Sequence, residues 1–467
     1  MVHEQSHRHL IAGAGTNAVP APPWVRFRTF EIALRPQWRS WIAFLVVAVG
    51  AVVLGGAALR TAIIDLLGES DDAEKIHRAI AMDPANPELY HRLGMVLCTS
   101  SGEACRTEGW RDLRRATELD PRTARYWTDL AWVCEMAGET ACATQSVEQA
   151  VKASPMTPQV HWLAANTLLR EGQREGAMAE FRRLLELDPT YAPATFHVCL
   201  GSLGDPQLIL QKVIPPAKDP SLRLAYLTFL RTNEEDEFAP QVWRQIVETG
   251  TRFPFSVTGP YIEHLLERGS FDEAQGAWRD LEKLGIIPSP TPGDEGNLVY
   301  NGDFETTPLN TGFDWRDQPA PFIALDFSDP SSHTGNHCLR IDFTVSRNEQ
   351  YSPITQLIPV SPKQSYVLTA FVRSQDITSD SGPRLQMLDP VQQRDPNIMS
   401  DTTVGTTPWH QVSMKFCTGA ATKIVQLSVV RVRGRTFPTE ISGSFWLDTV
   451  VLKPLASGES VCAERAP

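Results

Sequence analysis

Signatures of catalysis and of nucleic-acid binding are largely missing from this 467-residue sequence. It contains no G-x-S-x-G segment, which carries the nucleophile of many hydrolases, and no glycine-rich loop of the kind that cradles a phosphate. The formal net charge is −12 and no basic stripe with interleaved aromatic residues is present, which disfavours nucleic acid as a partner. A glycosidase needs two carboxylates at a fixed separation across a cleft, whereas the acidic residues of 297–455 cluster in turns. We therefore expect a protein that is not an enzyme.

Cysteine is also missing from the start of the chain. The eight cysteines all follow the one long apolar segment described next: Cys98, Cys105, Cys134, Cys142, Cys199, Cys338, Cys417 and Cys462. An even number of cysteines on one side of such a segment is compatible with an oxidising compartment. Zinc is the alternative, but no C-x-x-C pair exists.

The segment Ser40–Leu59 carries no charge and lies between Arg39 and Arg60. As a helix it would be about 30 Å long, which is the thickness of a bilayer's hydrocarbon core. Arginines outnumber acidic residues before it, and acidic residues dominate 60–75 after it. Because basic residues stay on the cytoplasmic side, the N-terminus is expected inside and the rest of the chain outside. A cleaved signal peptide and a buried helix of a soluble domain are the alternatives.

These flanks define the first predicted regions. We expect a disordered cytoplasmic tail at 1–37, a transmembrane helix at 38–60 in a bacterial inner membrane, and a periplasmic or other extracytoplasmic location after residue 60. The tail contains His3, His7 and His9, but a flexible tail would not preorganise these side chains for a metal.

From residue 72 onward, short amphipathic patterns end at LDP or a related tripeptide, and the breaks at Pro121, Pro155 and Pro189 are about 34 residues apart. This period is typical of stacked helical hairpins, none of which buries its apolar face alone. The chain here resembles the tetratricopeptide repeat family. Two consecutive units carry aromatic, Leu, small, bulky and Pro residues in that family's register: Trp127, Leu130, Ala131, Ala143, Val147, Ala150 and Pro155, then Ala165, Leu168, Ala177, Phe181, Leu184 and Pro189.

Weaker units flank these two. An earlier one contains Pro87, Tyr90, Leu93, Gly94, Ala116 and Pro121, and a last one contains Tyr261, Leu265, Gly269, Ala274, Trp278 and Leu281. The resemblance implies an irregular all-α solenoid over 72–284 that binds protein partners in the cell envelope.

Two cysteine pairs coincide with expected hairpin turns. Cys98 and Cys105 enclose Gly102, and Cys134 and Cys142 enclose Gly138. A hairpin turn can bring two Cα atoms within the roughly 4.4–6.8 Å that a disulfide requires, whereas a continuous helix would hold them about 11 Å apart. We therefore predict the disulfides Cys98–Cys105 and Cys134–Cys142. Cys199 is expected to be a buried thiol, although its pairing and that of Cys338, Cys417 and Cys462 stay open.

Residues 285–296 contain three prolines and three glycines, which indicates a linker. After it, runs rich in Val, Ile, Thr and aromatic residues alternate with turn residues, as in an all-β sandwich. The expected strands are 339–345, 351–358, 365–373, 384–387, 410–417, 423–432 and 444–452. A tail is expected at 456–467.

The segment 297–455 also resembles a known family. NLVYNGDFE at 297–305, HTGNHCLRIDF at 333–343, TTPWHQVSMKF at 406–416 and GSFWLDTVVL at 443–452 occur in the order typical of carbohydrate-binding modules of the family 4/9, CenC type. The resemblance implies a galactose-binding-like jelly roll, often with a structural calcium. It would place oxygen ligands at Gly302, Glu305, Asn336 and Asp448, although Thr449 stands where the family has a second acid. Two solvated acids that cap strand ends are the alternative.

Sugar binding requires exposed aromatic faces next to polar groups. The candidate rings are Trp315, Tyr351 and Phe437, with Trp315 equally compatible with a core position. The sequence therefore predicts a membrane-anchored scaffold that binds envelope proteins through its repeats and a polysaccharide or oligosaccharide through its sandwich, in cell-surface or exopolysaccharide synthesis or export. A pure protein-protein adaptor is the alternative, and a glycan hydrolase or its accessory protein is a lesser one.

Overall fold

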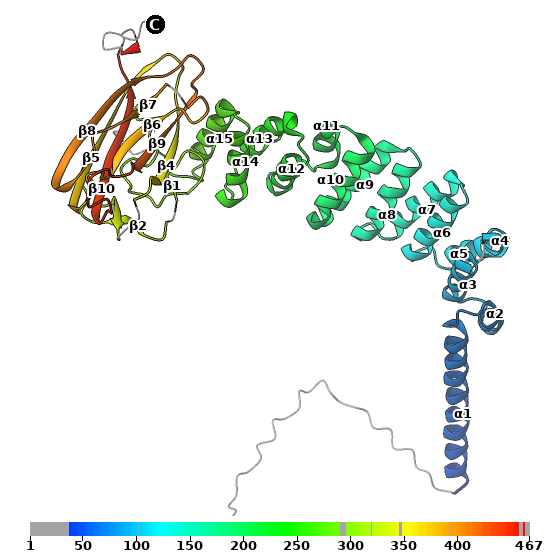
Figure 1. The fold of residues 1–467 in the computed structure, drawn as a ribbon. Helices are drawn as coiled ribbons and strands as arrows, with labels where there is room; N and C mark the ends of the chain where they lie inside the picture. The colour runs from blue at the N-terminus through cyan, green and yellow to red at the C-terminus, as the bar shows by residue number, and fades with distance from the viewer. Residues whose placement is uncertain are drawn as a thin grey trace, which may run out of the picture. The chain divides into compact units, whose positions relative to one another are not determined.

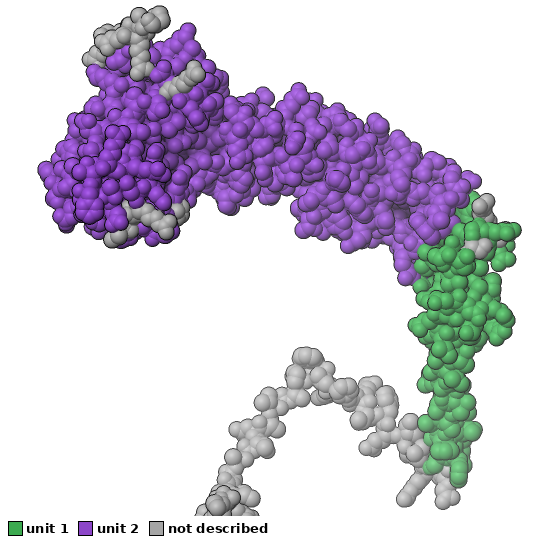
Figure 2. Space-filling model, in the orientation of Figure 1, with its two compact units in different colours: residues 1–120 green, residues 121–467 purple. Residues whose placement is uncertain are grey.

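The computed structural model describes residues 37–467, except 101, 290–295, 319, 345–347, 394, 457–460 and 463–467. Nearly all of the predicted cytoplasmic tail, half of the predicted linker and most of the predicted C-terminal tail therefore lie outside the described residues. The chain divides into two compact units, residues 1–120 and 121–467, which Figure 2 shows in different colours.

The first unit begins with a long apolar helix, α1 (Gln37–Gly68). The most apolar stretch within Trp38–Gly68 has no buried residue, and this helix is long and apolar enough to cross a membrane. A signal sequence would satisfy the same criterion. Near its C-terminal end, Ile64 packs against Ala79 and Leu89 of the following helices. The apolar segment thus continues directly into a folded region.

Four further helices complete this unit: α2 (Ala73–Met82), α3 (Pro87–Ser100), α4 (Gly102–Ala104) and α5 (Trp110–Leu119). A short π-helical segment, Cys105–Gly109, precedes α5. Helices α3 and α5 approach closely because Gly94 has no side chain: a Cβ there would lie 2.6 Å from Leu113 Cγ. The predicted disulfide Cys98–Cys105 joins α3 to the π-helical segment, with 4.1 Å between the two Cα atoms.

The second unit starts with two regular helical hairpins, α6 (Ala124–Met136) with α7 (Thr140–Ala153) and α8 (Pro158–Arg170) with α9 (Arg174–Leu187). Each hairpin turns at a glycine with positive φ, Gly138 and Gly172, both at +76°. Small residues let the helices approach, and one buried cluster of this region contains Ala131, Val147, Ala164, Leu168 and Ala177. The predicted disulfide Cys134–Cys142 spans the first turn, with 5.7 Å between the two Cα atoms.

The repeats become irregular after α9, where prolines interrupt the helices. The helices that follow are α10 (Ala192–Leu203), α11 (Pro206–Leu208), α12 (Ser221–Thr232), α13 (Ala239–Glu248), α14 (Phe255–Glu267) and α15 (Phe271–Lys283). Asp205 caps α11 by accepting from the backbone N–H groups of Gln207 and Leu208. The final pair, α14 and α15, turns at Gly269 with φ +74° and packs next to the β-domain (Figure 1).

The β-domain consists of two five-stranded antiparallel sheets. One has the order β1 (Arg316–Asp317), β4 (Tyr351–Pro359), β9 (Ile424–Arg431), β6 (Arg384–Leu388), β7 (Asn397–Met399). The other has the order β2 (Ile323–Asp329), β3 (Cys338–Phe343), β10 (Gly443–Pro454), β5 (Ser365–Ile377), β8 (Gly405–Cys417). Alternate apolar residues of both sheets, among them Leu339, Ile341, Val429 and Leu447, form the core between them.

Candidate functional site

The last helical hairpin and the β-domain share one hydrophobic core. Trp278 of α15 lies edge-on to Tyr300 and Phe313, with ring centroids 5.2 and 5.7 Å apart. Both of these rings belong to the loops that enter the β-domain, and Ile424 of β9 joins the same cluster. The side chain of Gln356 on β4 donates to the Tyr300 carbonyl oxygen over 2.7 Å. Because the packing is continuous, the repeats and the sandwich are fixed to each other within this unit.

A charged group reinforces this junction. Glu263 of α14 accepts hydrogen bonds from Thr311 Oγ1 and the Gly312 N–H, each over 2.5 Å. The guanidinium of Arg316 donates to both oxygens of the same carboxylate, over 2.9 and 3.0 Å. Such a bidentate pair is strong and specific in geometry. We call Glu263, Thr311, Gly312 and Arg316 the junction clamp.

Two backbone features hold the loop that carries the clamp. Gly312 has φ +63°, and a Cβ at this position would lie 2.1 Å from the ring of Trp278, so only glycine fits. The loop is closed by Asp314, which is 0% exposed and accepts from the N–H groups of Leu309 and Trp315, each over 2.7 Å. Burial raises the pKa of Asp314 to about 6. These features hold the loop in the conformation in which it contacts Glu263 of α14.

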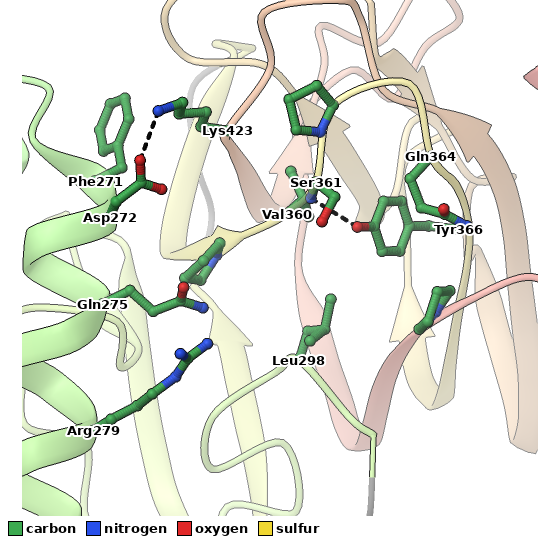
Figure 3. A pocket seen from close by; sticks show the side chains of 13 residues that line it. Phe271, Asp272, Gln275, Arg279, Leu298, Val360, Ser361, Gln364, Tyr366 and Lys423 are labelled. Carbon is green, nitrogen blue, oxygen red and sulfur yellow. Dashed lines mark hydrogen bonds and ion pairs between the residues drawn. The ribbon is translucent and has the colours of Figure 1, made fainter.

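A pocket of about 520 Å³ opens between α15 and the β-domain. Figure 3 shows Asp272, Gln275 and Arg279 on the helix side of it, facing Ser361, Gln364 and Tyr366 of the sandwich. Lys423 reaches across and forms an ion pair with Asp272 over 2.6 Å. A smaller adjoining pocket of about 170 Å³ shares Gln275, Arg279 and Leu298 with it. The pocket therefore combines polar side chains from two parts of the chain.

A separate surface lies on the repeats. Trp132 and Met136 of α6 are 39% and 68% exposed, and Leu163 of α8 is 46% exposed. The two helices are neighbours, since Glu135 of α6 accepts from the Arg170 guanidinium of α8. Large apolar side chains exposed on neighbouring helices are candidates for a protein-binding surface. We call Trp132, Met136 and Leu163 the repeat patch.

The predicted calcium ligands gather around one loop but are engaged by N–H groups. Glu305 Oε1 accepts from the N–H groups of Asn336 and His337 over 2.5 and 3.0 Å, and Oε2 accepts from Asn336 Nδ2 over 3.1 Å. Burial opposes ionisation of Glu305, yet these hydrogen bonds hold its pKa below the usual range. The carboxylate thus stabilises the 334–337 turn.

Asp448 and Gly302 are bonded in the same manner. Asp448 Oδ2 accepts from the N–H groups of His333 and Thr334 over 2.7 and 2.9 Å, and the Gly302 carbonyl oxygen accepts from the Val450 N–H over 2.8 Å. Burial raises the pKa of Asp448 despite these bonds. Each carboxylate oxygen has more than one lone pair, so these N–H donors do not exclude a cation at the remaining positions. Calcium binding here stays a prediction.

The three predicted sugar-binding rings have different environments. Trp315 is 0% exposed, stacks on Phe304 at 5.1 Å and donates from Nε1 to the Asn301 carbonyl oxygen, so no face of the indole is open to a ligand. Tyr351 is half-buried at the start of β4, whereas Phe437 is 91% exposed.

Tyr351 and the Phe437 loop are linked by one cation. The Arg431 guanidinium lies 5.7 Å from the Tyr351 ring and donates to the Thr439 carbonyl oxygen. The structure thus connects two of the three rings through one end of β9 and leaves Trp315 in the core.

The β-domain contains a further disulfide, and two cysteines of the described chain are not in disulfides. Cys417 and Cys462 form a third disulfide, with 5.1 Å between the two Cα atoms, which ties the chain after β10 to the end of β8. Cys199 and Cys338 are buried and free, and burial raises the pKa of each thiol to about 12. The third pairing carries no local signal, because its partners are 45 residues apart.

One motif was missed in the sequence. His3, Glu4 and His7 have the H-E-x-x-H spacing, which in metalloproteases presents two zinc ligands on one helix face. This segment lies outside the described residues, as does His9. Within the described residues, no group of three or more His, Cys, Asp or Glu side chains could hold a metal ion.

Comparisons with known proteins agree with the helical hairpins. Residues 137–192 match the family model of the tetratricopeptide repeat. No curated protein matches the chain.

Several solved structures are similar to parts of the chain. One, titled "CBM4 structure and function", is 15% identical and covers 34% of this chain and 99% of its own, with a TM-score of 0.25. MamA is 11% identical over 38% of this chain and 85% of its own, with a TM-score of 0.24. A tailspike protein of bacteriophage CBA120 is 14% identical over 34% of this chain, with a TM-score of 0.26, and this chain covers only 22% of that structure. At such TM-scores, these likenesses do not indicate what the chain binds.

Proposed function

We propose that this protein is a membrane-anchored scaffold that holds a protein partner on its repeats and a glycan on its sandwich. The observation that carries the proposal is the shared core around Trp278, which fixes two folds of the binding type to each other. A scaffold of this kind places a glycan at a set position relative to the bound protein. The proposal is independent of any reactive group.

The membrane anchor is α1, whose apolar surface matches a bilayer in length and composition. Its flanking arginines favour a cytoplasmic N-terminus in a bacterial inner membrane, with everything after residue 60 in the periplasm. The disulfides of the described chain suit this oxidising compartment. A reporter fused after residue 75 should be active only in its extracytoplasmic form, and cytoplasmic activity would contradict this orientation.

The protein partner would dock on the repeat patch. Trp132 and Met136 offer large apolar area of the kind that dominates binding energy at interfaces, and the neighbouring Arg170 supplies a polar rim. Solenoids commonly present such surfaces. Envelope proteins of cell-surface or exopolysaccharide synthesis or export are the proposed partners.

The glycan would bind the β-domain, whose motifs resemble carbohydrate-binding modules. Affinity electrophoresis of the full chain in detergent, in gels that contain different polysaccharides, tests this directly. Retardation by at least one polysaccharide is expected. A folded chain that no polysaccharide retards would exclude the glycan partner and favour a pure protein-protein adaptor.

Two further points belong to this proposal. A glycan hydrolase, or an accessory protein of one, is the lesser candidate, and release of reducing ends from a bound polysaccharide would establish it.

A structural calcium is proposed near Glu305 and Asp448. Addition of Ca²⁺ should then raise the midpoint of thermal unfolding, and an unchanged midpoint would argue against the site.

A further inference from the structure

The pocket between α15 and the β-domain has the size of a small-molecule site. Its volume of about 520 Å³ lies within the range of known ligand pockets, which is about 300–1,000 Å³. Asp272, Gln275 and Arg279 are spaced by three and four residues, so one face of α15 points into it (Figure 3). The opposite wall comes from the sandwich, including Gln364 and Lys423.

The two walls of the pocket are held in place before any ligand arrives. The junction clamp joins the neighbouring helix α14 to the loop before β1, and Trp278 of α15 packs in the shared core. The Lys423–Asp272 ion pair connects the walls at the rim. A preformed site loses little conformational freedom on binding, which favours affinity for a small ligand.

The lining suits a sugar ring. Its accessible apolar part includes Leu298 and three prolines, Pro359, Pro362 and Pro454, whereas Tyr366 is only 3% exposed and belongs to the sandwich core. Flat apolar surfaces of this kind pack against the apolar face of a pyranose, while amide and hydroxyl groups bond its hydroxyl rim. Gln275, Ser361 and Gln364 supply such groups at the same pocket.

The two basic residues that line the pocket, Lys423 and Arg279, differ in their ion pairing. The charge of Lys423 is neutralised by its ion pair with Asp272. Among the described residues that line this pocket, the remaining cation is Arg279, whose guanidinium forms no ion pair. Glu282, one turn further along α15, lines the smaller adjoining pocket and not this one. The charges of Glu282 and Arg279 do interact, but the two side chains form no ion pair. A guanidinium that has no hydrogen-bonded carboxylate prefers a planar one, which it binds with two parallel hydrogen bonds.

We propose that this junction pocket binds a uronic acid residue of an acidic oligosaccharide, with the sugar carboxylate on Arg279 and the hydroxyl groups on Gln275 and Gln364. The inference rests on the proposed glycan-binding function and assigns its place and its substrate class. The repeats and the sandwich then form the site together, and neither part contains it alone.

The test measures calorimetric binding to the full chain in detergent, with oligogalacturonate as the acidic probe and a cello-oligosaccharide of equal length as the neutral one. The wild type should bind oligogalacturonate more tightly. Arg279→Gln should weaken that binding by about tenfold or more, as expected for loss of a charged hydrogen-bonding partner, and should leave the neutral probe nearly unaffected. Arg244→Gln, at an exposed arginine of α13 away from the pocket, is the matched control and should change neither affinity.

The outcomes separate this inference from the general proposal. Equal affinity for both probes, or an unchanged affinity in Arg279→Gln, would overturn the junction site, while binding of a polysaccharide in gels would preserve the glycan-binding function. Absence of binding to every polysaccharide and both probes, with a folded chain, would overturn both. Circular dichroism of the variants verifies folding, and because Arg279 is exposed, its replacement should leave the spectrum unchanged.

Discussion

Replacing Glu263 with alanine should loosen the connection between the repeats and the β-domain. The substitution removes the acceptor of the Gly312 N–H and leaves the Arg316 guanidinium without its carboxylate. The two charged side chains are 29% and 26% exposed, so the pair is neither fully buried nor at the open surface. Breaking a buried pair costs about 3–5 kcal/mol and an exposed pair about 0–1 kcal/mol. We therefore expect a loss of about 2–3 kcal/mol in the free energy of unfolding.

The assay is urea unfolding of the full chain in detergent, followed by tryptophan fluorescence, to which Trp278 at the junction contributes as one of twelve tryptophans in the repeats, the sandwich and the remaining chain. Alanine should lower the midpoint and separate the single transition of residues 121–467 into two, because the shared core then opens before either part unfolds. Glu263→Gln keeps one acceptor oxygen and should lose only about 1–2 kcal/mol. Glu267→Ala, one turn further on α14 and exposed, is the control. Equal behaviour of the Glu263 and Glu267 variants would refute this account of the clamp.

Three further changes test other features. Gly312→Ala should cost about 2–4 kcal/mol, since it combines a positive φ with a clash against the Trp278 ring, and thermal unfolding measures it. Asp314 has a folded pKa of about 6, above its usual 3.8, so the free energy of unfolding should fall by up to about 3 kcal/mol as pH rises from 4 to 7. Asp314→Asn does not titrate, so urea unfolding should show its stability rising relative to that of the wild type over the same pH range. Cys417→Ser should cost about 2–4 kcal/mol, because the bond to Cys462 closes a long loop, and thermal unfolding under non-reducing conditions tests it.

Each of these predictions has a control. Gly269→Ala has a similar positive φ without a neighbour within 4 Å, so it should cost less than Gly312→Ala, and equal costs would exclude the clash. A difference between the wild type and Asp314→Asn that stays constant with pH would contradict the raised pKa. Under reducing conditions the wild type and Cys417→Ser should unfold alike, and a persistent difference would assign the effect to packing.

Much of the fold is visible in the sequence because local patterns determine it. The proline spacing from Pro121 to Pro189 marks the ends of regular hairpins, and the glycines Gly138 and Gly172 lie at their turns. The seven expected strands correspond to β3, β4, β5, β6, β8, β9 and β10. The strands that were missed, β1, β2 and β7, lie at sheet edges. β1 and β7 have only two and three residues, too few to show a pattern. In β2, Ile323, Leu325 and Phe327 alternate with exposed residues, so this strand could have been predicted.

The junction could not be predicted, because it depends on contacts between distant residues. Glu263 is an ordinary acidic residue of an amphipathic helix until the loop of Thr311 and Arg316 folds against it. Trp315 illustrates the same limit: its ring is as compatible with a binding face as with a core, and only the packing on Phe304 decides between them. The pocket beside α15 exists for the same reason, since its walls come from segments far apart in the chain.

The core around Trp278 also bears on how such a protein could have been assembled by recombination. Modules that move between genes usually have boundaries that stay polar when cut. A cut between α15 and the β-domain would expose Trp278 on one fragment and Tyr300 and Phe313 on the other, and both fragments would tend to associate. The core also continues from α14 back to α13, where Trp243 lies 5.5 Å from Tyr261, so a cut before Phe255 would expose large rings as well. The sandwich would therefore move between genes together with the repeats that share this core.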